Sequence, residues 1–553
     1  MIERDSSFLC GVPSPALRYV RLAVAGLAVL VPIQLLRLVT RSSLFSRFDY
    51  FEMVPTILDG DGSVIWSGLL VHQNEHLLAL PKIVYLANIW AFDGSNVTLG
   101  VFVWLVAGGV AVVLGLALRT HLPTNGWNLA VVTWLFAVYL FPLQAQHNFR
   151  LAMSGTAWIL ANLFAVAAIA LLVRERPVAA AAAGGLATLT YGTGLAVWPA
   201  LALVVLLRRR FGRGEAALVG VGMASIALQR LTAEPGRSAF YDWSPISVVR
   251  SMAITLGGLF TDDTRLAVLI GLGIAAVGVA AIVRLGPLVT ADGPLVLVAM
   301  MTFTSFGLVL FGISRSALGD ATFTASRYMA FAALFVLATS LLGLLAFGQS
   351  IGYRVLVMVV AVASLIASTS QTERFDAMTH AADLSMVAAY MGAGVGVVPL
   401  YSKETDAAFR AVGHIPFNGG FAHDCGLFGE RLDPSLVSTD DPVAGEILER
   451  RQAPTHSPFL QPVPVDEIPA FHISGSVIPV NEVECLVIRD ADSHVTGVGL
   501  LDPTVPVDVA GGCHPTGQRR WSAYVESDSP DGEVLVKLRG DDRFHVIDRL
   551  PDE

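Results

Sequence analysis

Residues 98–118 read TLGVFVWLVAGGVAVVLGLAL, a stretch without a single charged side chain. A helix of about 20 such residues is long enough to cross the hydrocarbon core of a bilayer. Comparable apolar runs start near residues 18, 126, 151, 178, 215, 265, 290, 328 and 355. The sequence therefore predicts a polytopic α-helical membrane protein with about 10 to 12 transmembrane helices.

The composition of the whole chain agrees with a membrane protein. Of its 553 residues 54% are hydrophobic and 15% are charged, and the mean hydropathy is +0.62, which is high for a soluble protein of this size. The formal charge is +7 over residues 1–370 and −16 over the remainder. Because nucleic-acid binding requires a basic surface, the acidic tail argues against nucleic acid as a partner. The apolar runs imply membrane lipids as partners.

Three regions follow from these patterns. Residues 1–370 form the predicted transmembrane domain, with a long external loop at 38–97. Residues 371–470 begin with helical signals and become rich in Pro, Gly and Asp, which is typical of an irregular connector. Residues 471–553 contain short β-branched runs, so we expect a soluble α+β tail that ends in a small β-sandwich.

The run at 178–207 is too long for one span and is interrupted by Thr190-Tyr191-Gly192-Thr193-Gly194. Two half-length helices that meet at this Gly-rich tip would explain both the length and the interruption. With this hairpin, the arginines of the short loops fall on one side of the membrane: Arg18, Arg21, Arg119, Arg174, Arg176, Arg208 to Arg210, Arg213, Arg284 and Arg354. A single straight span would break this agreement.

Arginine-rich loops are cytoplasmic in most membrane proteins, so the N-terminus is predicted to be cytoplasmic and the C-terminal domain extracytoplasmic. Lysine occurs only three times whereas Arg, Ala, Val and Gly are abundant, which is compatible with a GC-rich bacterial genome. The expected location is therefore a bacterial plasma (inner) membrane, crossed many times. Cys425, Cys485 and Cys513 would then face an oxidising compartment. The spacing leaves open whether two of them form a disulfide.

The first external loop carries the densest set of ionisable side chains. Asp49 and Glu52 are three residues apart, so on a helix they share one face and could act as a general base and its partner or hold a cation. Solvated surface charge is the competing explanation for each of them. The polar stretch at 73–76 adds substrate-binding candidates, namely Gln73, Glu75 and His76.

Arginines at the predicted outer face form a second set of candidates. Arg150 closes the loop that contains His147, Arg315 ends a span, and Arg327 lies in Ser326-Arg327-Tyr328. A guanidinium group recognises phosphate through a planar fork of donors, so this set fits a lipid-linked phosphate. Contact of single arginines with lipid headgroups is the alternative.

Tyr191 and Trp198 flank the glycines of the interrupted run. They could form an aromatic wall for a sugar or a polyprenyl chain. Close packing of helices through small residues would place them there as well.

Taken in order, these motifs resemble those of polytopic bacterial glycosyltransferases of the GT-C superfold. The resemblance covers about residues 15–370 and rests on Asp49-x-x-Glu52, Gln73-Asn74-Glu75-His76, Gly192-x-Gly194-x-x-x-Trp198-Pro199 and Ser326-Arg327-Tyr328.

The resemblance implies a GT-C-like bundle and transfer of a sugar, hexosyl or pentosyl, from a polyprenyl-phosphate donor to a glycan or lipid acceptor of the cell envelope. It implies Asp49 as the catalytic base, with Glu52 as the alternative, and Arg327 or Arg150 as the group that holds the donor phosphate. The acidic pair is often adjacent in other members of the superfold, so the choice of base stays open here. A divalent cation also stays open, with no metal ligand identified.

The tail is similar to the carbohydrate-binding sandwiches of cell-wall arabinosyltransferases and mannosyltransferases, with Trp521 and Tyr524 as candidate stacking residues. Burial on the inner face of a strand is the competing explanation for both residues. A transporter or flippase for a lipid-linked saccharide is the main alternative function, because interrupted helices also line transport paths. A non-catalytic envelope assembly protein is the third. Transport predicts charges inside the spans, and only Asp292 suggests one.

Overall fold

A computed structural model describes residues 23, 25–42, 49–73, 76–92, 94–122, 126–232, 244–315, 319–348, 350–390, 408, 431–438, 444–452, 470–478, 483–506, 519–526, 532–538 and 543–550, some of them by backbone alone. The chain divides into two compact units. One is the helical unit, residues 1–41, 69–84 and 97–372. The other comprises 42–68, 85–96 and the tail from 373.

The helical unit is built on helices that are long and apolar enough to cross a membrane. The described residues contain seven of them, which confirms a multi-pass helical membrane protein. They are α5 (Asn96–Leu118), α8 (Ala152–Val173), α14 (Asp292–Arg315), α15 (Ser326–Phe347), the first half of α16 (Ile351–Tyr390) and two composite spans. One composite span joins α6 (Gly126–Leu140), η2 (Leu143–Ala145) and α7 (Gln146–Arg150); the other joins α13 (Thr264–Leu285) and η4 (Gly286–Thr290).

Burial separates the core of this unit from its periphery. In α15, 83% of the most apolar window is buried, against 22% in α13. A helix that is apolar all round and buried by other helices lies at the centre of a bundle. Alternating small and large side chains, such as Gly307 on α14 facing Phe331 on α15, allow the central helices to approach closely.

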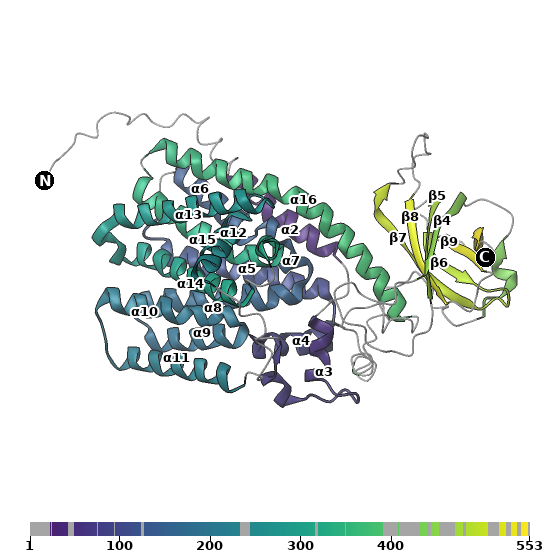
Figure 1. Ribbon diagram of the computed structural model, residues 1–553, viewed down its shortest axis with the longest axis horizontal. Helices are drawn as coiled ribbons and strands as arrows, with labels where there is room; N and C mark the ends of the chain where they lie inside the picture. The colour runs from purple at the N-terminus through teal and green to yellow at the C-terminus, as the bar shows by residue number, and fades with distance from the viewer. Residues whose placement is uncertain are drawn as a thin grey trace. The chain divides into compact units, whose positions relative to one another are not determined.

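The predicted hairpin at 178–207 is confirmed as two short helices. They are α9 (Pro177–Thr190) and α10 (Val197–Arg208), joined by η3 (Gly192–Ala196). Arg208 ends α10, and Glu175 lies just before α9. A guanidinium nitrogen of Arg208 lies 3.4 Å from Glu175 Oε1, so the chain returns to the side from which it started. Figure 1 shows α9 between α10 and α11 (Arg213–Leu231). The other helices of this unit are α2 (Leu30–Thr40), α4 (Ala79–Phe92, shared with the second unit) and α12 (Pro245–Gly257).

In the second unit, the segment that the sequence predicts to be an external loop forms α3 (Asp49–Ile57) and η1 (Trp66–Leu70). The helix forms because apolar residues recur at helical spacing, so that Tyr50, Met53, Val54 and Ile57 are all buried. The ring of Tyr50 packs edge-on against Tyr85 at a centroid distance of 5.4 Å. Burial raises the pKa of the Tyr50 phenol well above its usual range.

The tail contains one eight-stranded sheet with the order β3-β10-β9-β6-β7-β8-β5-β4. All neighbouring pairs are antiparallel except β3 and β10. Its strands are β3 (Val437–Ser438), β4 (Ala444–Gln452), β5 (Ala470–Ile478), β6 (Val483–Arg489), β7 (Val495–Pro506), β8 (Arg519–Glu526), β9 (Glu533–Leu538) and β10 (Phe544–Arg549), with a short η7 (Pro434–Leu436) before them.

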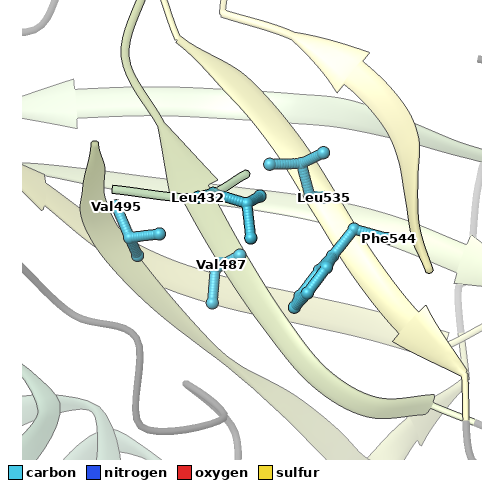
Figure 2. Packing of buried hydrophobic residues seen from close by; sticks show 5 residues of the cluster. All are labelled: Leu432, Val487, Val495, Leu535 and Phe544. Atoms are coloured by element: carbon cyan, nitrogen blue, oxygen red, sulfur yellow. The ribbon is translucent and has the colours of Figure 1, made fainter. Parts of the chain in front are cut away.

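A small apolar core supports this sheet. Figure 2 shows its side chains from β6, β7, β9, β10 and the segment before β3: Val487, Val495, Leu535, Phe544 and Leu432. The β-rich character of the tail is confirmed, and the packing of its strands into a sandwich stays a prediction. The sheet also begins earlier than expected, because β3 and β4 lie in the predicted irregular connector. Edge strand β4 is rich in Glu and Arg, as edge strands often are, and so lacks an apolar alternation.

Candidate functional site

Three segments far apart in the sequence meet at one end of the helical unit, which the arginine pattern predicts to be the outer end. The first is a hairpin of β1 (His72–Gln73) and β2 (His76–Leu77). The second is the η3 tip, and the third is the start of α15 beside α7. Together they bring several predicted substrate-binding residues to one place.

A run of aromatic rings connects these segments. The centroids of the His76 and Tyr191 rings are 4.2 Å apart, and those of Tyr191 and Trp158 on α8 are 4.6 Å apart. Trp158 in turn lies 5.5 Å from Tyr328 on α15. Trp158 and Tyr328 are buried, whereas His76 and Tyr191 are half-buried, so the hairpin end of the run is accessible.

Gly192 is required for the contact between the hairpin and the tip. A Cβ atom at this position would lie 2.4 Å from His76 Nδ1, which is closer than non-bonded atoms approach. A larger residue would therefore push the hairpin away from η3.

Arg327 lies at the other end of the aromatic run. Its side chain is exposed, and its guanidinium carbon is 4.9 Å from the centre of the Tyr328 ring. A guanidinium over an aromatic face is held by a cation–π interaction and keeps its planar donors available.

The backbone around Arg327 is fixed by hydrogen bonds to the α7 segment. Asn148 Nδ2 donates to the carbonyl oxygen of Arg327 over 2.8 Å, and Ser154 Oγ donates to Asn148 Oδ1, also over 2.8 Å. Ser326 Oγ donates to the carbonyl oxygen of Gln144 and accepts the N–H of His147 at 3.3 Å. We call these residues the α7–α15 polar cluster.

Arg150 is the last residue of the same short helix, α7. It is almost fully buried, and its guanidinium donates to Gln146 Oε1 over 3.3 Å, while Gln146 Nε2 donates to Thr372 Oγ1 over 3.1 Å. The structure thus places His147 and Asn148 of α7 beside Ser326 and Arg327, whereas the described hydrogen bond of Arg150 is to Gln146 within α7.

The η6 turn (Asp320–Thr324) before α15 is also held in place. Arg250 on α12 donates to Asp320 through two of its nitrogens, with Nε 3.0 Å from Oδ2. Bidentate pairing of this kind fixes orientation as well as distance. It limits the freedom of the turn that precedes Ser326.

Two residues near this end, Lys82 and Gln144, were not predicted as site residues from the sequence. Lys82 on α4 is fully buried and donates to the carbonyl oxygen of Val71 over 2.8 Å, which fixes the start of the hairpin. Burial lowers the pKa of Lys82 to about 8. The rarity of lysine in this chain, with only Lys82, Lys403 and Lys537, was the available signal.

Gln144 is the second missed residue. It is buried beside Ser326, and neither amide atom of its side chain makes a hydrogen bond with any described residue. Since buried amides are nearly always hydrogen-bonded, it is a candidate for contact with a bound polar group. Nothing in the local sequence distinguishes it from a surface glutamine.

Other predicted residues lie elsewhere or are described only in part. Trp198 packs on Gly184 and Gly222, and its indole N–H donates to Thr188 Oγ1 over 3.0 Å, so its described contacts are those of helix packing. Arg315 ends α14, and Gln73 is buried in β1. Glu75, Cys425 and Cys513 lie outside the described residues, and Trp521, Tyr524 and Cys485 are described by backbone alone.

The catalytic candidates Asp49 and Glu52 lie in the first turn of α3, in the second unit, and the structure bears out the predicted helix. Only the backbone of Asp49 is described, and Glu52 is half-buried. Carboxylates in the first turn of a helix are stabilised by its N-terminal N–H groups. Within the described ranges, no three His, Cys, Asp or Glu side chains gather as a metal site would require.

Asp292, the one residue that suggested a charge inside a span, lies at the start of α14 and is exposed. Its carboxylate pairs with Arg208. It is therefore a charge at the end of a helix and does not mark a transport path.

Comparison with known proteins identifies no relative of this chain. No family model matches the chain, and neither the curated proteins nor the solved structures contain a match.

Proposed function

We propose that the protein is a membrane glycosyltransferase that moves a sugar from a polyprenyl-phosphate donor to a cell-envelope acceptor on the outer face of the membrane. The observation that carries the proposal is the exposed guanidinium of Arg327, fixed over Tyr328 at one end of an aromatic run. A phosphate needs such a donor fork, and a sugar or prenyl chain packs well on aromatic rings.

In the proposed reaction, a carboxylate of α3 takes the proton from an acceptor hydroxyl. The resemblance favours Asp49, with Glu52 as the alternative. The hydroxyl oxygen forms a bond to the anomeric carbon with inversion, while the bond from that carbon to the phosphate oxygen breaks and its electron pair leaves with the phosphate. Arg327, with Arg150 as the alternative, stabilises the charge that develops on the leaving phosphate.

The location of charged residues supports an enzyme over a transporter. In the seven candidate spans the charged side chains, among them Arg150, Arg315 and Arg327, lie at or near the ends. Transport of an ionic substrate usually involves ionisable groups near the centre of the membrane.

The test uses purified wild type, Asp49→Asn and Glu52→Gln in detergent with a panel of polyprenyl-phosphate sugars, assayed for sugar release with and without EDTA. Asp61→Asn is the matched control from the same loop. The N–H of Ser63 donates to Asp61 over 2.8 Å, which lowers the pKa of this exposed carboxyl and makes it a poor base.

We expect turnover in wild type and Asp61→Asn and its loss in one of the other variants, with unchanged melting temperatures. Loss on EDTA treatment would add a divalent cation to the proposed reaction. Absence of turnover with every donor, combined with unchanged donor binding in both variants, would refute the catalytic proposal and favour transport or assembly.

A further inference from the structure

A hollow of about 220 Å³ lies at the other end of the helical unit, between the end of α5, the end of α8 and the start of α14. Its apolar wall comes from Leu116, Ala117, Ala170, Val173 and Val296. Its polar rim comes from Arg119, Thr120, His121, Arg174 and Asp292. The combination suits a ligand with an anionic head and an apolar continuation.

Charge at this rim is unbalanced in favour of cations. Asp292 pairs with Arg208, and Glu175 pairs with Arg208 and Arg210. The two carboxylates of this ion network are thus neutralised by arginines outside the rim. Arg119 and Arg174 therefore leave an excess of positive charge at the hollow.

The donors of these two arginines are only partly used. Arg174 donates one hydrogen bond, over 2.6 Å, to the carbonyl oxygen of Leu116 in the last turn of α5. In the described part of the chain, Arg119 makes no hydrogen bond and no ion pair, and its side chain is exposed.

The rim is also shaped by close packing. A Cβ atom at Gly293 would lie 2.5 Å from Cβ and Cγ of His121, so the absence of a side chain at residue 293 lets the His121 ring lie against the start of α14. His121 Nδ1 is 3.0 Å from Thr120 Oγ1. These contacts give the segment after α5 a defined position at the mouth of the hollow.

We propose that this hollow binds the phosphate headgroup of an anionic membrane lipid. Its volume is below that of sites for drug-sized ligands, and its arginine forks match phosphate oxygens. Basic pockets between transmembrane helices on the cytoplasmic side bind anionic headgroups, and the arginine pattern predicts this end to be cytoplasmic. Lipid is always present at a helix end in a bilayer, and the apolar wall offers a surface for its glycerol and upper acyl carbons.

The experiment titrates the full-length protein in a non-ionic detergent with dioleoylphosphatidylglycerol. Parallel titrations use dioleoylphosphatidylcholine and sodium phosphate. Melting temperature reports binding, because a ligand of the folded state stabilises it, and native mass spectrometry counts retained lipids. The variants are Arg119→Gln and, as the matched control, Arg284→Gln, an exposed arginine at the end of α13 that does not line the hollow.

We expect phosphatidylglycerol to raise the melting temperature of wild type and of Arg284→Gln, with one retained lipid. In Arg119→Gln the apparent affinity should fall by about tenfold, as for the loss of a hydrogen bond between charged groups. Phosphatidylcholine and sodium phosphate should have little effect. Equal responses of Arg119→Gln and Arg284→Gln would overturn the proposal, as would a full response to sodium phosphate, which would identify a soluble anion as the ligand.

Discussion

Helix α8 connects two ends of the helical unit that use arginine in different ways. Its 22 residues span about 33 Å. Near its first residue, Arg327 lies over an aromatic ring and its backbone is held by neutral side chains. Beyond its last residue, Arg208 is bound to two carboxylates. Paired charges anchor a helix end, whereas an exposed guanidinium with free donors can bind an anion. Of these two arginines, Arg327 is therefore suited to hold a phosphate and Arg208 is not.

The largest expected effect comes from substituting one arginine at each end. Arg327→Gln should lower kcat/KM for a polyprenyl-phosphate sugar by about 100-fold to 1000-fold, because a donor to developing charge is lost. Arg208→Gln, at the other end, should change it by less than about threefold. Arg327→Lys should lie between the two, since it keeps the charge without the planar fork. Equal losses in Arg327→Gln and Arg208→Gln would mean that the two ends do not differ in function.

Glycine substitutions test how tightly the helices pack at the end of the helical unit that carries Arg327, which we call the first end. A Cβ atom at Gly155 would lie 1.8 Å from the backbone oxygen of Asn148, whose side chain holds Arg327. Gly155→Ala should therefore lower the free energy of unfolding by about 3 kcal/mol. Gly108→Ala on α5 meets no atom within 4 Å and should be neutral or slightly stabilising. Denaturation in detergent measures both, and similar values would contradict the described packing.

Lys82 gives the first end a pH dependence. It lies on α4, which is not one of the seven candidate spans, and its pKa is lowered from 10.5 to about 8 by burial. Between these values the unfolded chain binds the proton and the folded chain does not, so stability should rise with pH, by about 3 kcal/mol over the whole interval. Below pH 8 both states are protonated and this contribution is constant.

The measurement compares wild type with Lys82→Met, which cannot titrate at this position. The difference between their unfolding free energies should change between pH 8 and pH 10 and stay constant between pH 6 and pH 7.5. A difference that is independent of pH throughout would show that Lys82 has its ordinary pKa in the folded state.

The smallest expected effect concerns the ion network at the end of the helical unit that carries Arg208, which we call the second end. Asp292→Asn should lower stability by at most about 1 kcal/mol, because the pair with Arg208 is partly exposed to solvent. In 1 M NaCl the difference from wild type should shrink further, since salt screens exposed pairs. A larger loss, insensitive to salt, would mean that this end is as tightly built as the first.

Much of the fold could be predicted because its signals are local. Seven of the apolar runs are helices of membrane-spanning length, and the glycines at 192 and 194 separate two short helices as expected. The β-branched runs at 483–488, 495–501 and 534–538 are strands of the sheet. Strands β3 and β4 escaped prediction because their residues lack the alternation that marks a half-buried strand.

The candidate site was predictable in composition and not in geometry. His76, Tyr191 and Arg327 were chosen for their chemistry, and the structure places them along the aromatic run. Arg150 was chosen in the same way, and its guanidinium donates to Gln146 within α7. Trp198 was chosen for the same reason and packs between helices instead. An aromatic side chain beside glycines looks the same in sequence whether it faces a ligand or a neighbouring helix.

The sequence by itself determined that the protein is a multi-pass membrane protein with a β-rich tail, because hydropathy and residue periodicity act within about 20 residues of chain. Only the tertiary structure decided which polar groups meet. Asn148 holds Arg327 across 179 positions, and Gly192 admits His76 from a segment more than 100 residues earlier. Such contacts form because helix packing brings distant segments within van der Waals distance, and no local pattern encodes that approach.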